Sequence, residues 1–165
     1  MQQMHDSVIV GGGPAGASCA LWLARLGLAP LLVEAGDRLG GLSSDNPFTD
    51  DWIAVLPGVT GQQVAANIDT SVRAAGVPLR LGARVTAVRP CKGGIEASLS
   101  DENGGVSQVR GRTLVIASGV RAKGFPEHPP RIALARRAYR PGLAHRGAGL
   151  LRPVRRRAGR RRQRL

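Results

Sequence analysis

Apolar and polar positions follow a strand, turn, helix and strand order at the start of the chain. Residues 5–10 end in three apolar residues, and residues 11–16 then read Gly-Gly-Gly-Pro-Ala-Gly. Apolar positions recur at helical spacing over residues 17–27, and residues 30–33 are apolar again before Glu34. This order predicts a βαβ unit that has a Gly-x-Gly-x-x-Gly turn and an acid after its second strand.

The glycine spacing gives each position of the turn a physical role. Gly11 allows a tight turn out of the strand, Gly13 lets the backbone approach a pyrophosphate, and Gly16 lets the helix pack closely on the sheet. Pro14 and Ala15 begin the helix, whose free amide groups and positive dipole end attract an anion. We therefore predict that main-chain groups of this turn hold the diphosphate of a dinucleotide.

Glu34 lies 23 positions after Gly11, at the predicted end of the second strand. A carboxylate there can accept hydrogen bonds from the hydroxyls of a ribose, and it repels a 2′-phosphate. The pattern favours FAD or NAD over NADP. A glycine-rich turn without any ligand is the alternative that the fingerprint alone leaves open.

Two further segments carry glycines outside this fingerprint. Residues 34–41 continue from the acid to the pair Gly40-Gly41, and residues 113–119 are an apolar run that ends in Ala-Ser-Gly. Both resemble segments of the flavoproteins with two dinucleotide-binding domains, the pyridine nucleotide-disulfide oxidoreductase superfamily. In that family the second run ends in Ala-Thr-Gly, so Ser118 keeps a hydroxyl group.

The middle of the chain is similar to the thioredoxin-reductase-like branch of that superfamily, through Asn46-Pro47 and residues 57–61. The resemblance extends over about residues 5–127 and implies FAD binding. The implied cofactor contacts are Gly11, Gly13, Pro14, Ala15, Gly16, Glu34, Ala35, Gly40, Gly41, Leu42, Val85, Ala117, Ser118 and Gly119. Val85 would offer backbone groups to the adenine; an ordinary strand valine is the alternative.

The remaining periodicity completes an α/β fold. Residues 62–75 have apolar positions at helical spacing and end at Gly76, which predicts a helix with a glycine C-cap. Residues 77–81 predict a short strand. Alternating segments joined by glycine-containing turns follow at 84–89, 95–100 and 106–110. We predict a Rossmann-like FAD-binding domain with a parallel sheet, into which a three-stranded antiparallel β-meander is inserted before a final parallel strand.

Charge divides the chain at residue 128. The sequence has 24 Lys plus Arg and 11 Asp plus Glu, a net charge of +13. All 11 acids lie in residues 1–127 with 11 bases, whereas residues 128–165 contain 13 Arg, no Lys and no acid. Because the tail shows no sustained apolar period, we expect a domain over residues 1–127 and an irregular, disordered basic tail over residues 128–165.

Three interpretations of the tail stay open. Clustered arginines neutralise phosphates, which suggests nucleic-acid binding, but the tail has no lysine and a single aromatic residue, Tyr139. A solvated extension is the second. The third is a frameshift, because out-of-frame GC-rich DNA yields Arg, Ala, Gly, Pro and Leu without lysine. Some codon choices allowed for residues 160–164 encode a glycine turn when they are read one base later. We favour the frameshift and expect no nucleic-acid partner.

These features predict an FAD-binding oxidoreductase domain that lacks an NAD(P)H-binding half. At about 150 residues per domain, 165 residues leave room for one nucleotide domain. In the resembled family FAD accepts hydride from NAD(P)H, so NAD(P)H would be the reductant only with a second domain, and we expect no turnover by this chain alone. A non-catalytic dinucleotide-binding module is the alternative. Without the second domain, apolar surface that it would cover is exposed, so a homodimer is a further alternative.

Other chemistry has little support in the sequence. Cys19 and Cys91 form no Cys-x-x-Cys motif, and we expect a core Cys19 and an exposed, inert Cys91, as suits a reducing cytoplasm. We expect Trp52 to anchor the core rather than contact a flavin. Neither a triad nor a metal-ligand pattern involves the three histidines, which are His5, His128 and His145. With no signal peptide and no long apolar run, we expect a soluble cytoplasmic protein without a membrane partner.

Overall fold

A computed structural model of the chain describes residues 3–49 and 56–120, which lie within one compact unit, Met1–Arg121. The predicted tail and Trp52 lie outside the described residues. The predicted domain boundary at residue 128 lies outside them as well.

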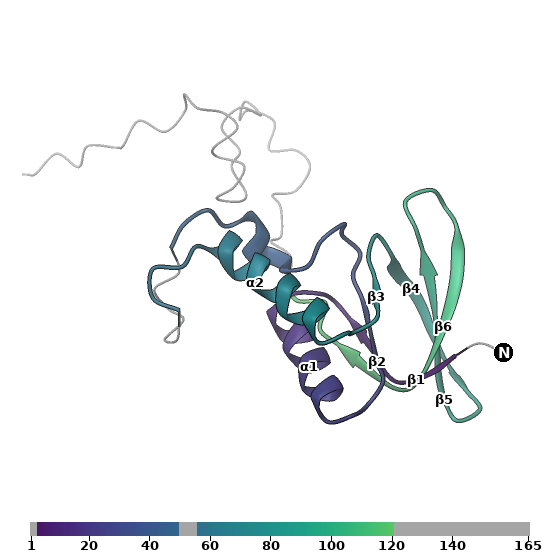
Figure 1. The fold of residues 1–165 in the computed structure, drawn as a ribbon. Coiled ribbons are helices and arrows are strands. Elements are labelled where there is room, and N and C mark those ends of the chain that lie inside the picture. Colours follow the sequence, from purple (N-terminus) through teal and green to yellow (C-terminus); the bar gives the residue numbers. More distant parts are fainter. Residues whose placement is uncertain (1–2, 50–55, 121–165) are drawn as a thin grey trace, which may run out of the picture. The chain divides into compact units, whose positions relative to one another are not determined.

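The described elements form one six-stranded sheet with two helices (Figure 1). In chain order they are β1 (Met4–Val10), α1 (Pro14–Arg25), β2 (Pro30–Val33), the 3₁₀ helix η1 (Gly41–Asp45), α2 (Gly61–Ala74), β3 (Leu79–Arg80), β4 (Arg84–Cys91), β5 (Gly94–Ser100) and β6 (Val106–Ile116). The strand order is β3-β2-β1-β6-β5-β4. β3, β2, β1 and β6 are parallel neighbours, and β5 is antiparallel to β6 and β4. The predicted α/β class with a meander is confirmed.

One strand replaces two predicted ones. The meander strand predicted at 106–110 and the parallel strand predicted at 113–119 are the continuous β6, which ends at Ile116. Its first part pairs with β5 and its second part with β1, and Gly111 pairs with both Ile95 and His5. A Cβ at Gly111 would lie 2.9 Å from the Val8 side chain, so a glycine lets the strand pass from one partner to the other. β3 is also shorter than predicted, at two residues.

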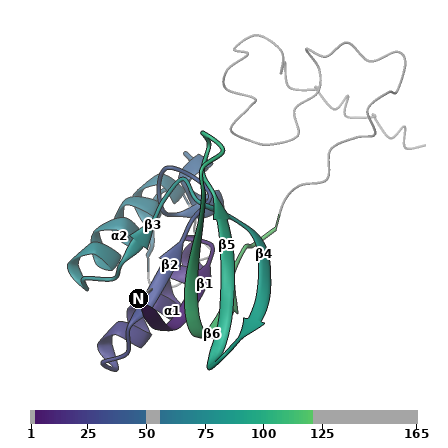
Figure 2. The same ribbon diagram turned by 90° about the vertical axis from the view of Figure 1, so that its right-hand side faces the viewer.

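β1 and β2 carry apolar side chains on both faces, because successive strand residues point to opposite sides. The core toward the helices consists of Ile9, Ala17, Ala20, Leu32, Leu39, Val72 and Val77. The core toward the meander consists of Val8, Leu31, Val33, Ala97, Leu99 and Val109. Figure 2 shows α1 and α2 on one side of β1 and β2, and β4 and β5 on the other. The parallel strands are covered on both faces, which explains their continuous apolar sequence.

The two cysteines and His5 lie within helices and strands of the fold. Cys19 is half-buried and packs against the core toward the helices. Cys91 is half-buried rather than exposed as predicted, because it ends a strand of the meander and its Sγ lies 3.9 Å from the carbonyl oxygen of Lys92. His5 is buried in β1. Among the described residues, neither helix has the length and apolar character needed to cross a membrane.

Candidate functional site: the glycine cluster

Of the three fingerprint glycines after β1, packing requires Gly11 and Gly16 but not Gly13. A Cβ on Gly11 would overlap the carbonyl oxygen of Ala117, and a Cβ on Gly16 would overlap the carbonyl oxygen of Gly11. At Gly13, the nearest atom to an added Cβ is the Cα of Gly41 at 3.8 Å, and φ is −72°. The fold would therefore accept a side chain at residue 13, and glycine leaves an open space there.

The two helices differ at their N-termini. Thr60 caps α2 through a capping box with Gln63: its Oγ1 accepts from the Gln63 N–H at 3.2 Å, and its own N–H donates to the Gln63 side chain at 2.8 Å. The N-cap of α1 is Gly13, followed by Pro14, and no side chain caps it. The first amides of α1 are thus free to bind an anion at its positive dipole end, whereas those of α2 are capped.

Glu34 lies beside the turn because two backbone amides hold its carboxylate. Its Oε2 accepts from the Gly12 N–H at 2.6 Å, and its Oε1 accepts from the Gly36 N–H at 2.7 Å. A carboxylate has about four lone-pair positions, so each oxygen keeps capacity for a hydroxyl group. The sequence prediction missed the roles of Gly12 and Gly36; the available signal was that Gly12 lies inside the glycine turn and Gly36 lies two residues after the acid.

The second glycine pair lies against the first turn. The Gly40 N–H donates to the carbonyl oxygen of Gly12 at 2.9 Å. A Cβ on Gly41 would lie 3.0 Å from the Cα of Gly13, and both residues of the pair have positive φ, 111° and 54°. Leu42 follows at the start of η1 and is exposed. Gly41 therefore borders the open space at Gly13.

The end of β6 completes this arrangement. The Ala117 N–H donates to the Val10 carbonyl at 2.8 Å, which brings Ala117 against Gly11 and Gly16. Ser118 and Gly119 follow it and are exposed. We call the converged residues the glycine cluster: Gly11, Gly12, Gly13, Gly16, Glu34, Gly40, Gly41 and Ala117.

Some predicted contacts lie outside the glycine cluster itself. Pro14 and Ala15 are exposed at the start of α1, and Ala35 follows Glu34. Val85 belongs to β4 and packs against the core toward the meander. It is connected to the site through Ala83, whose N–H donates to the Glu34 carbonyl oxygen at 3.0 Å.

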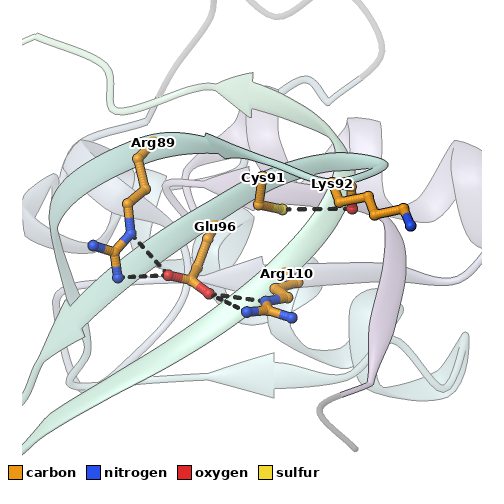
Figure 3. A network of polar contacts seen from close by, with 5 residues as sticks. All are labelled: Arg89, Cys91, Lys92, Glu96 and Arg110. Carbon is orange, nitrogen blue, oxygen red and sulfur yellow. Dashed lines mark hydrogen bonds and ion pairs between the residues drawn. The ribbon is translucent and has the colours of Figure 1, made fainter.

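The strongest charge network lies in the meander (Figure 3). Glu96 is buried between Arg89 and Arg110, and each guanidinium donates from Nε and Nη2 to one carboxylate oxygen at 2.7–2.9 Å. The hydrogen bonds from Arg110 and Arg89 lower the pKa of Glu96. Burial, and secondarily the charge of Arg80, lowers the pKa of His5. Within residues 3–49 and 56–120, no three His, Cys, Asp or Glu side chains gather as a metal site would require.

Comparison with known proteins agrees with this geometry. Residues 9–59 match the family model of the NAD(P)-binding Rossmann-like domain. One subunit of the alkyl hydroperoxide reductase of Staphylococcus aureus is 32% identical over 118 residues, which are 72% of this chain and 22% of the relative. This similarity indicates the pyridine nucleotide-disulfide oxidoreductase family. The chain spans only about a fifth of the length of this curated relative.

Two solved structures show the same fold. Thioredoxin reductase of T. acidophilum superposes with a TM-score of 0.62 at 23% identity, over 74% of this chain and 38% of the other. The flavin-dependent monooxygenase PieE in complex with FAD and substrate superposes with a TM-score of 0.56 at 20% identity, over 72% of this chain and 31% of the other. The predicted fold is thus confirmed, and the predicted family resemblance agrees with the sequence relative.

Proposed function

We propose that this chain is the FAD-binding domain of a flavoprotein oxidoreductase of the thioredoxin-reductase-like branch. One observation carries the proposal: the open space at Gly13 adjoins both the uncapped N-terminus of α1 and a carboxylate fixed by Gly12. A diphosphate needs main-chain donors and close backbone approach, and a ribose needs an oriented acceptor. Both requirements are met side by side.

Each part of the site has a role in this proposal. The amides at the start of α1, those of Ala15 and Gly16, bind the diphosphate, and Glu34 binds the ribose hydroxyls. Gly40, Gly41 and Leu42 lie toward the flavin, as do Ala117, Ser118 and Gly119. Val85 offers its backbone to the adenine. When bound, FAD supplies an acceptor for hydride from NAD(P)H, and the protein supplies binding and orientation.

NAD is the second candidate ligand, because the matching family model describes NAD(P)-binding domains. Support for FAD comes from the second glycine pair, which borders the space at Gly13 and so extends the site beyond one fingerprint. PieE, which shares the fold, is a complex with FAD. Glu34 disfavours NADP because its carboxylate repels a 2′-phosphate.

We infer further that the 165-residue chain does not oxidise NAD(P)H by itself. Its sequence contains one Gly-x-Gly-x-x-Gly fingerprint, which FAD occupies in this proposal. NAD(P)H would therefore need a second dinucleotide domain. Two free cysteines support a reducing, cytoplasmic location.

Titration of the purified full chain tests the proposal. We expect FAD to bind with heat release and quenching of its fluorescence, NAD⁺ to bind more weakly than FAD, and NADP⁺ more weakly still. Mixing the FAD-loaded chain with NADH or NADPH should leave the absorbance at 340 nm unchanged. A chain that is folded by circular dichroism and binds no FAD, or prefers NAD⁺, would refute the proposal.

A further inference from the structure

Gly40 is pressed between the glycine turn and α2. A Cβ added to Gly40 would overlap the Cβ of Ala65, would lie 2.9 Å from the Cα of Ala65, and would lie 2.6 Å from the Oγ of Ser44. On its other side the Gly40 N–H donates to the Gly12 carbonyl at 2.9 Å. The backbone of α2 at Ala65 is therefore in direct contact with the second glycine pair.

This contact continues into the proposed cofactor space. Gly41 follows Gly40 and approaches Gly13 so closely that an added Cβ would lie 3.0 Å from the Gly13 Cα. A displacement of Gly40 would therefore change the distance between Gly41 and Gly13. Ala65 does not border that space itself, so any effect that it has on a ligand acts through Gly40.

α2 is fixed well enough to act as a support. Gly61 is buried at its start, where an added Cβ would lie 2.6 Å from the Cβ of Asn46. The Gly61 N–H donates to the Phe48 carbonyl at 3.2 Å, and the Gln62 N–H donates to the Asn46 carbonyl at 3.0 Å. Val72 is fully buried in the core toward the helices. With both ends of α2 held, a larger side chain at residue 65 displaces Gly40 rather than the helix.

We propose that Ala65 is the positioning residue of the FAD site: its small side chain lets α2 hold Gly40 against Gly12 and so sets the gap between Gly41 and Gly13. This inference rests on the proposed function for its ligand, although the contact itself is independent of any ligand. Only alanine or glycine leaves the required room, because close-packed interiors respond to a single added methylene.

The test compares Ala65→Val with Ala66→Val in the full chain. Ala66 is the next residue of α2 and is exposed, so the second variant carries the same loss of helix propensity without the contact. We expect Ala65→Val to weaken FAD binding at least ten-fold in a fluorescence titration and Ala66→Val to leave it unchanged. Ala65→Ser, with one added atom, should give an intermediate affinity and serves if the valine variant does not fold.

Two controls separate positioning from general destabilisation and from failure of the proposed function. Val72→Ala lowers stability in the same helix without touching Gly40, so FAD affinity below its melting temperature should match that of the wild type. Amide hydrogen exchange is measured without FAD. The Gly40 amide should exchange at least ten-fold faster in Ala65→Val than in the wild type, and faster to a lesser degree in Ala65→Ser. The Gly11 amide, which donates to the Val33 carbonyl, should stay protected. Unchanged Gly40 exchange overturns the inference whether or not FAD binds, and equal losses of affinity in the Ala65 and Ala66 variants overturn it too.

Discussion

Gly12 and Glu34 are joined by a hydrogen bond of 2.6 Å from the Gly12 N–H to Oε2, although 22 positions separate them in sequence. The bond links the middle of the glycine turn to the end of β2. A carboxylate anchored by main chain has little freedom, so its position follows that of the turn. The proposed phosphate and ribose sites are thus one rigid unit, and a substitution in either site should lower the affinity for the same ligand.

The first prediction concerns Glu34→Gln. The amide keeps the shape of the side chain, but its NH₂ group faces a backbone donor and leaves one N–H of Gly12 or Gly36 without an acceptor. The ribose hydroxyls would also lose a charged acceptor, and a hydrogen bond to a charged group is worth about 1.5–3 kcal/mol. We therefore expect FAD affinity to fall roughly ten- to hundred-fold, measured by fluorescence titration at pH 7. Asp37→Asn, at an exposed neighbouring acid, is the control and should bind like the wild type; normal binding by Glu34→Gln would contradict the ribose role.

The second prediction separates two glycines of one turn. Gly13→Ala meets only the Gly41 Cα at 3.8 Å, so its free energy of unfolding should stay within about 0.5 kcal/mol of the wild type, while FAD affinity should fall at least ten-fold. Gly16→Ala overlaps the Gly11 carbonyl oxygen and should lose about 1–3 kcal/mol of stability. Urea unfolding and FAD titration on both variants measure the two effects. If Gly13→Ala loses stability but not affinity, the open space has no ligand role.

The third prediction concerns the cap of α2. Thr60→Ala removes the acceptor for the Gln63 N–H and breaks the capping box. Loss of such a cap costs about 1 kcal/mol, which urea unfolding can resolve. Thr70→Ala, at an exposed position inside the same helix, is the matched control and should be neutral or slightly stabilising because alanine has the higher helix propensity. Equal midpoints for the two variants would argue against the cap.

The fourth prediction concerns acid stability. Hydrogen bonds from Arg110 and Arg89 lower the pKa of Glu96 in the folded chain, so the unfolded chain binds the proton more readily. The stabilisation is therefore complete above the unfolded pKa, about 4.3, and is lost as the pH falls through the folded pKa. Glu96→Gln should be less stable than the wild type at pH 7, and the difference should shrink by pH 3.

Urea midpoints of the wild type and Glu96→Gln at pH 7, 5 and 3 provide the measurement. Glu102→Gln, at an exposed turn position, should track the wild type throughout. A gap between Glu96→Gln and the wild type that stays constant with pH would mean that packing, not charge, explains the loss.

Local features of the fold followed from the sequence. The fingerprint from Gly11 to Gly16 predicted the turn and α1, and the acid at residue 34 predicted the end of β2. The apolar period before Gly76 predicted α2. These features depend on propensities and periods within about fifteen residues, which sequence displays directly. The position of Val85 relative to a ligand stays a prediction.

Sequence by itself determined most of the order of elements and the resemblance to the family, and it supplied the residues that we propose bind a dinucleotide. Tertiary structure decided how they meet: that β6 is one strand changing partners at Gly111, that Gly12 and Gly36 hold Glu34, and that Ala65 abuts Gly40. Each of these is a contact whose geometry depends on how the sheet and helices pack. Short-range periodicity carries no information on such contacts, since a glycine looks alike whether it faces a ligand, a carbonyl oxygen or a helix.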